Sequence, residues 1–120
     1  MGKVLVIDDS QTVRAAVERE LAKDGHTVVS LRAFTELPTC LARFQPDLVI
    51  LDLEMPALSG VAFASFLRRY ESRQTPILVY SGKQADELHQ AVSQIGAVGS
   101  VSKSQPYETL RSQVRRALSG

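Results

Sequence analysis

The stretch KVLVIDD at residues 3–9 and the stretch DLVILD at residues 47–52 decide the fold of this chain. Each holds a short apolar run that ends in an acid, and such a run is typical of a strand buried on both faces. Ligands of parallel sheets bind beyond the carboxyl ends of the strands. If these two strands are neighbours, Asp8, Asp9 and Asp52 converge. Carboxylates this close raise each other's pKa, so we expect a bound cation there.

The composition predicts one globular domain, which we place at residues 1–120. With 44% hydrophobic and 22% charged residues, the chain has the balance of a soluble protein. The net charge of +1 gives no reason to expect nucleic-acid binding. No apolar run approaches the roughly 20 residues of a membrane helix, and we see no secretory leader. The single cysteine, Cys40, excludes an internal disulfide and fits a reducing, cytoplasmic compartment.

Strands and helices alternate along the chain. Short apolar or β-branched runs predict strands at residues 3–7, 27–31, 47–51, 77–80 and 98–101. Apolar residues at helical spacing predict helices at residues 11–23, 37–44, 63–70, 88–95 and 106–118. Parallel strands need crossover connections, so this alternation predicts an α/β fold with helices on both faces of a five-stranded parallel sheet.

Polar residues at the predicted strand ends form a chemically complementary set: Asp8, Asp9, Asp52, Ser81 and Lys103. The carboxylates suit Mg²⁺, the lysine supplies a compact positive charge, and the serine supplies a hydroxyl donor. Gly82 lets a backbone N–H approach a ligand closely. Such a set clamps a phosphoryl group, since phosphoryl transfer depends mostly on positioning and charge neutralisation. Asp52 is the candidate covalent acceptor, because it stands alone on its strand opposite the acidic pair.

Four local strings in this order resemble the receiver domains of two-component response regulators. The most specific is DLEMPALSG at residues 52–60, which is similar to the acceptor loop of that family. VIDDS at 6–10 resembles its acidic pair, YSG at 80–82 its hydroxyl position, and GAVG at 96–99 leads to the lysine at the family's spacing. The resemblance covers residues 3–118. In length the chain is nearest to the single-domain regulators of the chemotaxis type. It implies a flavodoxin-like, doubly wound (βα)5 sandwich with strand order 2-1-3-4-5.

The resemblance implies a signalling function. Asp52 accepts a phosphoryl group from a histidine kinase or phosphotransfer protein in a Mg²⁺-dependent reaction. Lys103 pairs with the acceptor or its phosphate, and Ser81 moves toward the phosphoryl group. The implied metal ligands are Asp52 and Asp9 directly, Asp8 mainly through water, and Glu54 through its backbone carbonyl.

The resemblance also implies how the signal leaves the site. The phosphoryl group changes the surface of the last two strands and last two helices, where an unknown downstream protein binds. The chain then catalyses only its own phosphorylation and dephosphorylation. We expect a monomer, because the helices at 88–95 and 106–118 show no strongly apolar surface stripe.

The chain departs from the family pattern at two positions. Ser100 stands where the family usually has an aromatic residue that packs inward, which puts that relay in doubt here. Ser104 replaces a proline after the lysine, so we expect a trans peptide bond at this position. Glu54 and Lys83 occupy the variable positions that flank the acceptor, and we expect them to pair across its mouth. Tyr80 is expected to pack on the helix at 88–95.

Several residues have a simpler interpretation. We expect His26 and His89 to be solvated, because neither has metal-ligand spacing to another histidine or to cysteine. Cys40 lies on an apolar helix face and is expected in the core. Met55 and Pro56 are expected to shape the loop. The last helix carries Arg111, Arg115 and Arg116, which are expected either on a solvated face or on a partner surface.

Two other functions compete with the phosphoacceptor. A degenerate receiver would act as a phosphorylation-independent interaction module; Ser100 and Ser104 favour it, while the intact acids and lysine oppose it. A small phosphatase with an aspartate nucleophile would need a second acid two residues after the first, whereas Asp8 and Asp9 are adjacent. A dinucleotide-binding domain is disfavoured, because no Gly-x-Gly-x-x-Gly string follows the first strand.

Overall fold

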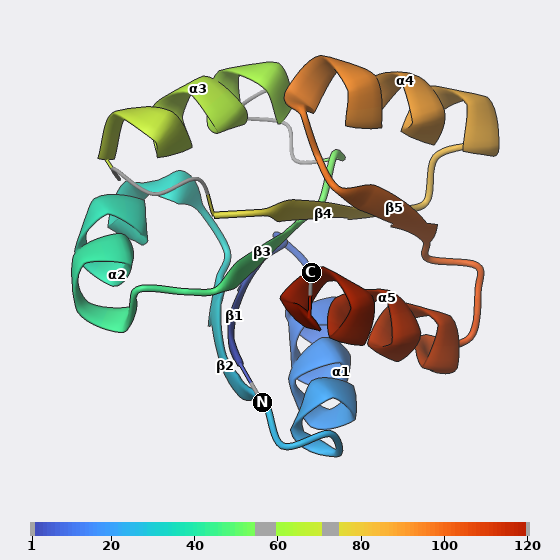
Figure 1. Cartoon of the computed structure of the whole chain (residues 1–120), viewed down its shortest axis with the longest axis horizontal. Helices are drawn as coiled ribbons and strands as arrows, with labels where there is room; N and C mark the ends of the chain where they lie inside the picture. Colours follow the sequence, from blue (N-terminus) through green and yellow to red (C-terminus); the bar gives the residue numbers. More distant parts are fainter. Residues whose placement is uncertain (1, 55–59, 71–74, 120) are drawn as a thin grey trace.

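The computed structural model describes residues 2–54, 60–70 and 75–119, and it contains the predicted alternation of strands and helices (Figure 1). The strands are β1 (Lys3–Ile7), β2 (Thr27–Leu31), β3 (Leu48–Leu51), β4 (Ile77–Ser81) and β5 (Gly99–Ser102). The helices are α1 (Gln11–Ala22), α2 (Leu37–Phe44), α3 (Gly60–Tyr70), α4 (Ala85–Ile95) and α5 (Tyr107–Ser119), with a short 3-10 turn, η1 (Phe34–Glu36), before α2.

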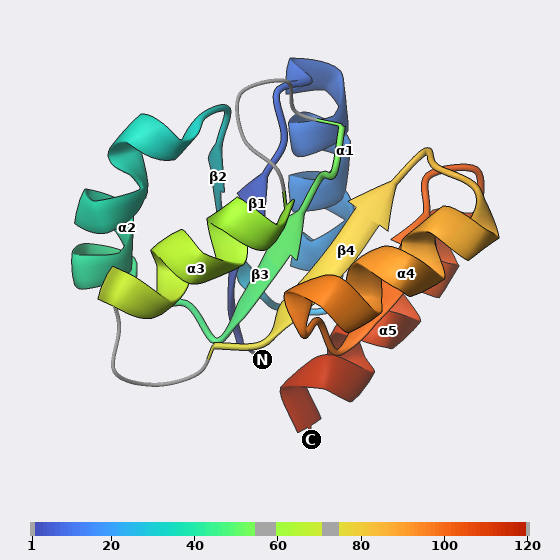
Figure 2. The same ribbon diagram turned by 90° about the horizontal axis from the view of Figure 1, so that it is seen from above.

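The five strands form one parallel sheet in the order β2-β1-β3-β4-β5, which confirms the expected topology (Figures 1 and 2). Ile7 pairs with Leu51 in β3, and Leu51 pairs with Val79 in β4. The carboxyl ends of the central strands therefore meet at one edge. β5 begins and ends one residue later than expected. Val101 is buried in the core, whereas its neighbour Ser100, which points to the opposite face, is half-buried.

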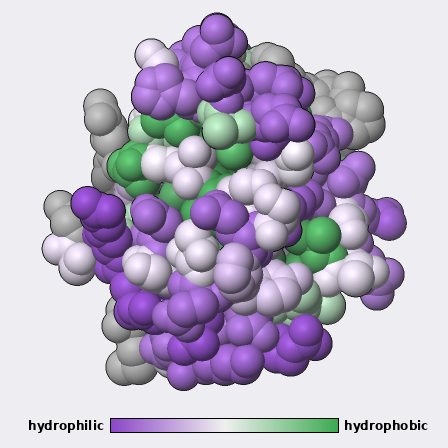
Figure 3. All heavy atoms as spheres, turned by 90° about the vertical axis from the view of Figure 1, so that its right-hand side faces the viewer, coloured by the Kyte–Doolittle hydropathy of each residue, from purple (hydrophilic) through white to green (hydrophobic). Residues whose placement is uncertain are grey.

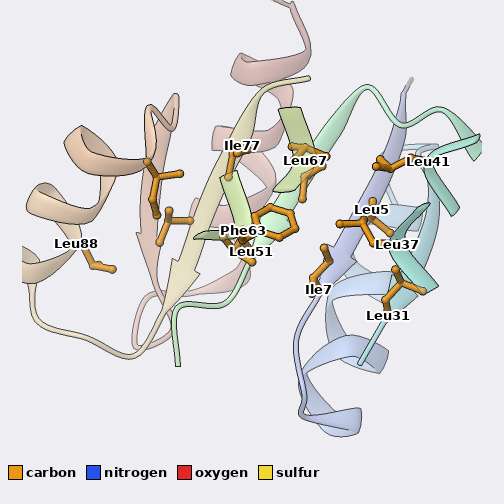
Figure 4. Close-up of a cluster of buried hydrophobic side chains, with 13 residues drawn as sticks. Leu5, Ile7, Leu31, Leu37, Leu41, Leu51, Phe63, Leu67, Ile77 and Leu88 are labelled. Carbon is orange, nitrogen blue, oxygen red and sulfur yellow. The ribbon is translucent and has the colours of Figure 1, made fainter. Parts of the chain in front are cut away.

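Helices cover both faces of the sheet. One buried cluster contains alternate strand residues, among them Leu5, Val49 and Val79, packed against α2, α3 and α4 (Figure 4). The other contains the intervening residues, among them Val4 and Ile50, packed against α1 and α5. Because both faces are covered, every position of β3 and β4 is buried. This is the physical reason for their uninterrupted apolar sequence.

The helix ends follow local rules. Ser10 caps α1 by accepting a hydrogen bond on its hydroxyl from the Val13 N–H at 3.3 Å. Gly96 ends α4 in the left-handed conformation with φ of 75°, and Gln45 ends α2 with φ of 51°. No helix in the described part of the chain is both long and apolar enough to cross a membrane.

Two expectations about the core are wrong. His26 is buried rather than solvated, at 9% exposure, and its Nδ1 accepts a hydrogen bond from the Gly2 N–H at 3.1 Å. Burial lowers the pKa of His26, and the Gly2 contact requires the unprotonated nitrogen.

Tyr80 packs in the cluster beneath α1 and α5 rather than on α4, because Val79 already faces α4 and successive strand residues point to opposite faces. His89 is exposed, as expected, and Cys40 is half-buried against the first cluster.

The arginines of α5 are tied to the turn after α1. Arg111 binds both carboxylate oxygens of Asp24, with Nη2 at 2.6 Å from Oδ1 and Nε at 3.2 Å from Oδ2. Arg115 adds a contact to Asp24 at 2.8 Å and one to Glu108 at 3.2 Å. Arg116 is exposed on the same helix. The Arg111 guanidinium is the main cause that lowers the pKa of Asp24 to about 2.

The Asp24 contacts predict a pH-dependent loss of stability. The pKa of Asp24 is about 2 in the folded protein against 3.8 ordinarily, so its contribution is complete above the ordinary value and disappears as the pH falls through 2. Asp24→Asn is therefore expected to lower the melting temperature at pH 7, with the difference from wild type shrinking toward pH 2. Thermal unfolding at a series of pH values measures this. Asp86→Asn, which changes an exposed acid on α4 outside this cluster, is the control. A difference that is constant over this range would contradict the prediction.

Candidate functional site

Three acids lie together where β1 and β3 end. Asp8, Asp9 and Asp52 each bring a carboxylate oxygen within 4.8 Å of the others. Ile7 pairs with Leu51, and the acids come directly after this pair: Asp8 and Asp9 follow Ile7, and Asp52 follows Leu51. Asp8 and Asp52 are buried, at 2% and 4% exposure, whereas Asp9 is exposed. Two of the three acids are thus buried inside the site, and the third is exposed to solvent.

Lys103 is the cation that offsets the buried acids. Its Nζ lies 3.0 Å from Asp8 Oδ2 and 3.4 Å from Asp52 Oδ1. The backbone holds it in place, because the Lys103 N–H donates to the Ser81 carbonyl at 2.8 Å. Burial alone would lower the pKa of Lys103, but hydrogen bonding and attraction from Asp8 and Asp52 raise it. The lysine therefore stays charged and bridges both acids, with Asp8 the nearer.

Asp52 has an under-compensated charge. Burial is the main cause that raises its pKa, and repulsion from Asp8 raises it further. Two contacts act in the opposite direction: the Glu54 N–H donates to Asp52 Oδ1 at 3.0 Å, and Lys103 attracts the carboxylate. Since the net shift is upward, one lysine does not fully balance the site. A further cation would stabilise the ionised form of Asp52.

The donor set fits a hard divalent cation. All three acids offer oxygen, the ligand atom that Mg²⁺ prefers. In the described part of the chain the carboxylate of Asp9 has no hydrogen-bond or ion-pair partner, so its oxygens remain available. Asp8, by contrast, uses Oδ1 to accept the Ser10 N–H at 2.9 Å and Oδ2 to bind Lys103. Asp9 and Asp52 are thus better placed than Asp8 to be direct ligands.

Ser81 ends β4, which lies in the sheet between β3, followed by Asp52, and β5, followed by Lys103. Its side chain is fully buried; the hydroxyl accepts the Lys83 N–H at 3.2 Å and donates to Glu54 Oε1 at 3.4 Å. The Glu54 side chain also lies over Gly82, since a Cβ atom at Gly82 would meet Oε1 at 3.1 Å. Glu54 therefore covers this side of the site.

The expected pair between Glu54 and Lys83 is wrong. Lys83 Nζ instead lies 3.5 Å from Glu87 Oε2, which is four residues further along the chain in the first turn of α4. The local spacing of four residues explains this contact, whereas Glu54 is directed to the Ser81 hydroxyl.

A contact of Arg14 was not expected from the sequence. Its Nη1 donates to the backbone carbonyl of Asp8 at 2.7 Å. Arg14 lies six residues after Asp8, within the first turns of α1. A cation is electrostatically disfavoured at this positive end of a helix, and that was the available signal in the sequence that Arg14 has a partner.

A hollow of about 560 Å³ opens next to the site, between α4 and β5. Its lining includes Gly82, Leu88, Ser100, Ser102 and Ser104. Ser100 is half-buried here, so a small hydroxyl stands where the family pattern has an aromatic ring. The described backbone contains no cis peptide bond, which confirms the trans bond expected at Ser104. This side of the molecule is mostly hydrophilic, with small apolar areas (Figure 3).

The other predicted residues are brought together as expected. One edge of the sheet holds all seven of them: Asp8, Asp9, Asp52, Glu54, Ser81, Gly82 and Lys103. Met55 and Pro56, with the rest of residues 55–59, lie outside the described residues, so their loop-shaping role stays a prediction.

Comparison with known proteins gives a consistent result. Residues 4–115 match the response regulator receiver domain family. The solved chemotaxis response regulator CheY4 of Vibrio cholerae is 30% identical, with a TM-score of 0.85 over 98% of this chain and 99% of that chain. A response regulator receiver domain from Bermanella marisrubri is 32% identical, with a TM-score of 0.85 over 97% of both chains.

The curated relatives are longer proteins. The transcriptional regulatory protein YxdJ of Bacillus subtilis is 26% identical over 98% of this chain and 52% of its own length. A protein-glutamate methylesterase/protein-glutamine glutaminase of Xanthomonas oryzae is 39% identical over 84% of this chain and 29% of its own length. The chain thus spans about half or less of the length of these relatives.

Proposed function

The chain belongs to the family of response regulator receiver domains, and we propose that it is a phosphoacceptor switch in which Asp52 takes a phosphoryl group from a histidine kinase or a phosphotransfer protein. The observation that carries the proposal is the position of Lys103, whose Nζ bridges Asp8 and Asp52 and whose backbone N–H donates to the Ser81 carbonyl. Phosphoryl transfer needs positioning and charge neutralisation, and this arrangement supplies both.

The hydrogen bonds of Asp52 favour one oxygen as the nucleophile. Oδ1 accepts the Glu54 N–H and pairs with Lys103, while Oδ2 has no partner among the described residues. We assign attack on phosphorus to Oδ2. The new O–P bond forms as the N–P bond of the phosphohistidine breaks, and the electron pair of that bond returns to the imidazole nitrogen. Lys103 then pairs with a phosphoryl oxygen. The chain catalyses only this transfer and the later hydrolysis.

The metal ligands of the proposal are Asp9 and Asp52 directly, the Glu54 carbonyl, and Asp8 through water. Asp8 is assigned the indirect role because both of its carboxylate oxygens already have partners. A bound Mg²⁺ supplies positive charge opposite the phosphoryl oxygens.

Ser81 is the residue that we propose to transmit the change. The phosphoryl group adds a charge of about −1.5 to −2 and offers strong acceptor oxygens. Ser81 then turns from Glu54 Oε1, at 3.4 Å, to a phosphoryl oxygen. This movement biases the end of β4 and the adjoining hollow toward a second conformation. A downstream protein reads that conformation on the face formed by α4, β5 and α5, and the domain acts as a cytoplasmic monomer.

A phosphorylation-independent interaction module is the second candidate. It is favoured by Ser100, which leaves a polar hollow where an inward-packing aromatic ring would give the switch its usual relay. The complete set of acids around Lys103 favours the phosphoacceptor instead.

Asp52 is expected to be the single site of phosphorylation. Incubation with acetyl phosphate and Mg²⁺, followed by intact-mass measurement, is expected to give one phosphate adduct on the wild type and none on Asp52→Asn. Asp86→Asn, which changes an exposed acid on α4, is the matched control and is expected to keep the adduct. A wild-type protein that takes no phosphate under any condition would support the interaction module.

Glu54 and Lys83 are expected to differ in their effect on the acyl phosphate. Because the Glu54 side chain covers Ser81 and Gly82, Glu54→Ala admits water and is expected to shorten the phosphoryl lifetime by about threefold. Lys83→Ala is expected to leave the lifetime unchanged, since Lys83 binds Glu87. Loss of radiolabel from the purified phosphoprotein measures both. Equal effects in the two variants would show that they act as a pair after all.

A further inference from the structure

Arg14 reaches from α1 to the end of β1, where its Nη1 donates a hydrogen bond to the Asp8 carbonyl at 2.7 Å. We propose that Arg14 is a positioning residue for divalent-cation binding: it fixes the peptide unit between Asp8 and Asp9 and thereby aims the Asp9 carboxylate at the cation. The inference rests on the proposed function, because it assumes that Mg²⁺ binds at Asp9.

Arg14 completes the fixation of Asp8. The Asp8 N–H donates to the Leu31 carbonyl at 3.1 Å, Oδ1 accepts the Ser10 N–H at 2.9 Å, and Oδ2 pairs with Lys103 at 3.0 Å. With the carbonyl bound by Arg14, every polar atom of Asp8 has a partner. A charged donor makes a stronger hydrogen bond than a neutral one, so the carbonyl contact is a firm anchor.

The anchor acts on Asp9 through the covalent geometry of the chain. The Asp8 carbonyl oxygen, the Asp9 nitrogen and the Asp9 Cα lie in one peptide plane. Fixing the oxygen therefore fixes the plane from which the Asp9 side chain projects. Asp9 needs this support, because its carboxylate is exposed and has no partner of its own in the described part of the chain.

Simple electrostatics does not account for Arg14. A cation at the start of α1 opposes the helix dipole, which favours negative charge there. A positive charge near the acids also weakens their attraction for another cation. The first effect predicts that removing the charge stabilises the helix, and the second predicts that it strengthens Mg²⁺ binding. Positioning predicts instead that removal weakens Mg²⁺ binding. The sign of the change therefore separates the two explanations.

The test compares Arg14→Gln with Arg19→Gln, which removes the same charge from an exposed position on the same helix. Isothermal titration calorimetry with Mg²⁺ on the unphosphorylated protein is expected to show binding weakened by about tenfold in Arg14→Gln, as for other residues that orient metal ligands. Arg19→Gln is expected to bind like the wild type. Amide hydrogen exchange at Ser10, whose N–H donates to Asp8 Oδ1, is expected to rise in metal-free Arg14→Gln alone.

The outcomes separate this inference from the proposed function. Wild-type protein that binds no Mg²⁺ would overturn both. Wild-type binding with equal or tighter binding by Arg14→Gln would overturn only the role of Arg14. If Arg14→Gln lost Mg²⁺ affinity and thermal stability together, and Arg14→Lys restored both to the same extent, the residue would be structural rather than positioning. Stability restored without affinity would support the positioning role.

Discussion

The repulsion between Asp8 and Asp52 is the constraint on which the site depends. Both carboxylates are almost fully buried, where water screens the repulsion between like charges only weakly. Lys103 lies between them, at 3.0 Å and 3.4 Å, and the net upward shift of the Asp52 pKa indicates that the compensation is incomplete. The site is thus left with an affinity for positive charge. In the proposed function a cation at the exposed Asp9 meets this need, and the cation and Lys103 together then hold the phosphoryl group.

The parallel sheet creates this repulsion, and its sequence signature made most of the fold predictable. A strand covered by helices on both faces must be apolar at every position, as Val4 to Ile7 and Leu48 to Leu51 are. Once such runs are identified as parallel neighbours, the residues that follow them must meet at one edge. The convergence of Asp8, Asp9, Asp52, Ser81 and Lys103 could therefore be predicted without any knowledge of side-chain geometry.

What could not be predicted depends on contacts between side chains and distant backbone. His26 is buried because Gly2, 24 residues earlier, donates to its ring, and no local pattern marks that contact. The carbonyl bound by Arg14 is not marked in the sequence either, although a cation at the positive end of a helix was a signal that Arg14 has a partner. Two other failures had usable signals. Strand alternation places Tyr80 opposite the face that Val79 shares with α4, and helical spacing links Lys83 to Glu87.

The central claim is that Asp52 carries a charge that Lys103 balances only in part and that a divalent cation balances further. The most direct measurement is the pKa of the Asp52 carboxyl, followed by carbon NMR of the side chain. In metal-free wild type the pKa is expected above the ordinary aspartate value, higher still in Lys103→Gln, and lower when Mg²⁺ is added. An ordinary pKa that responds neither to Mg²⁺ nor to loss of the lysine would contradict the account.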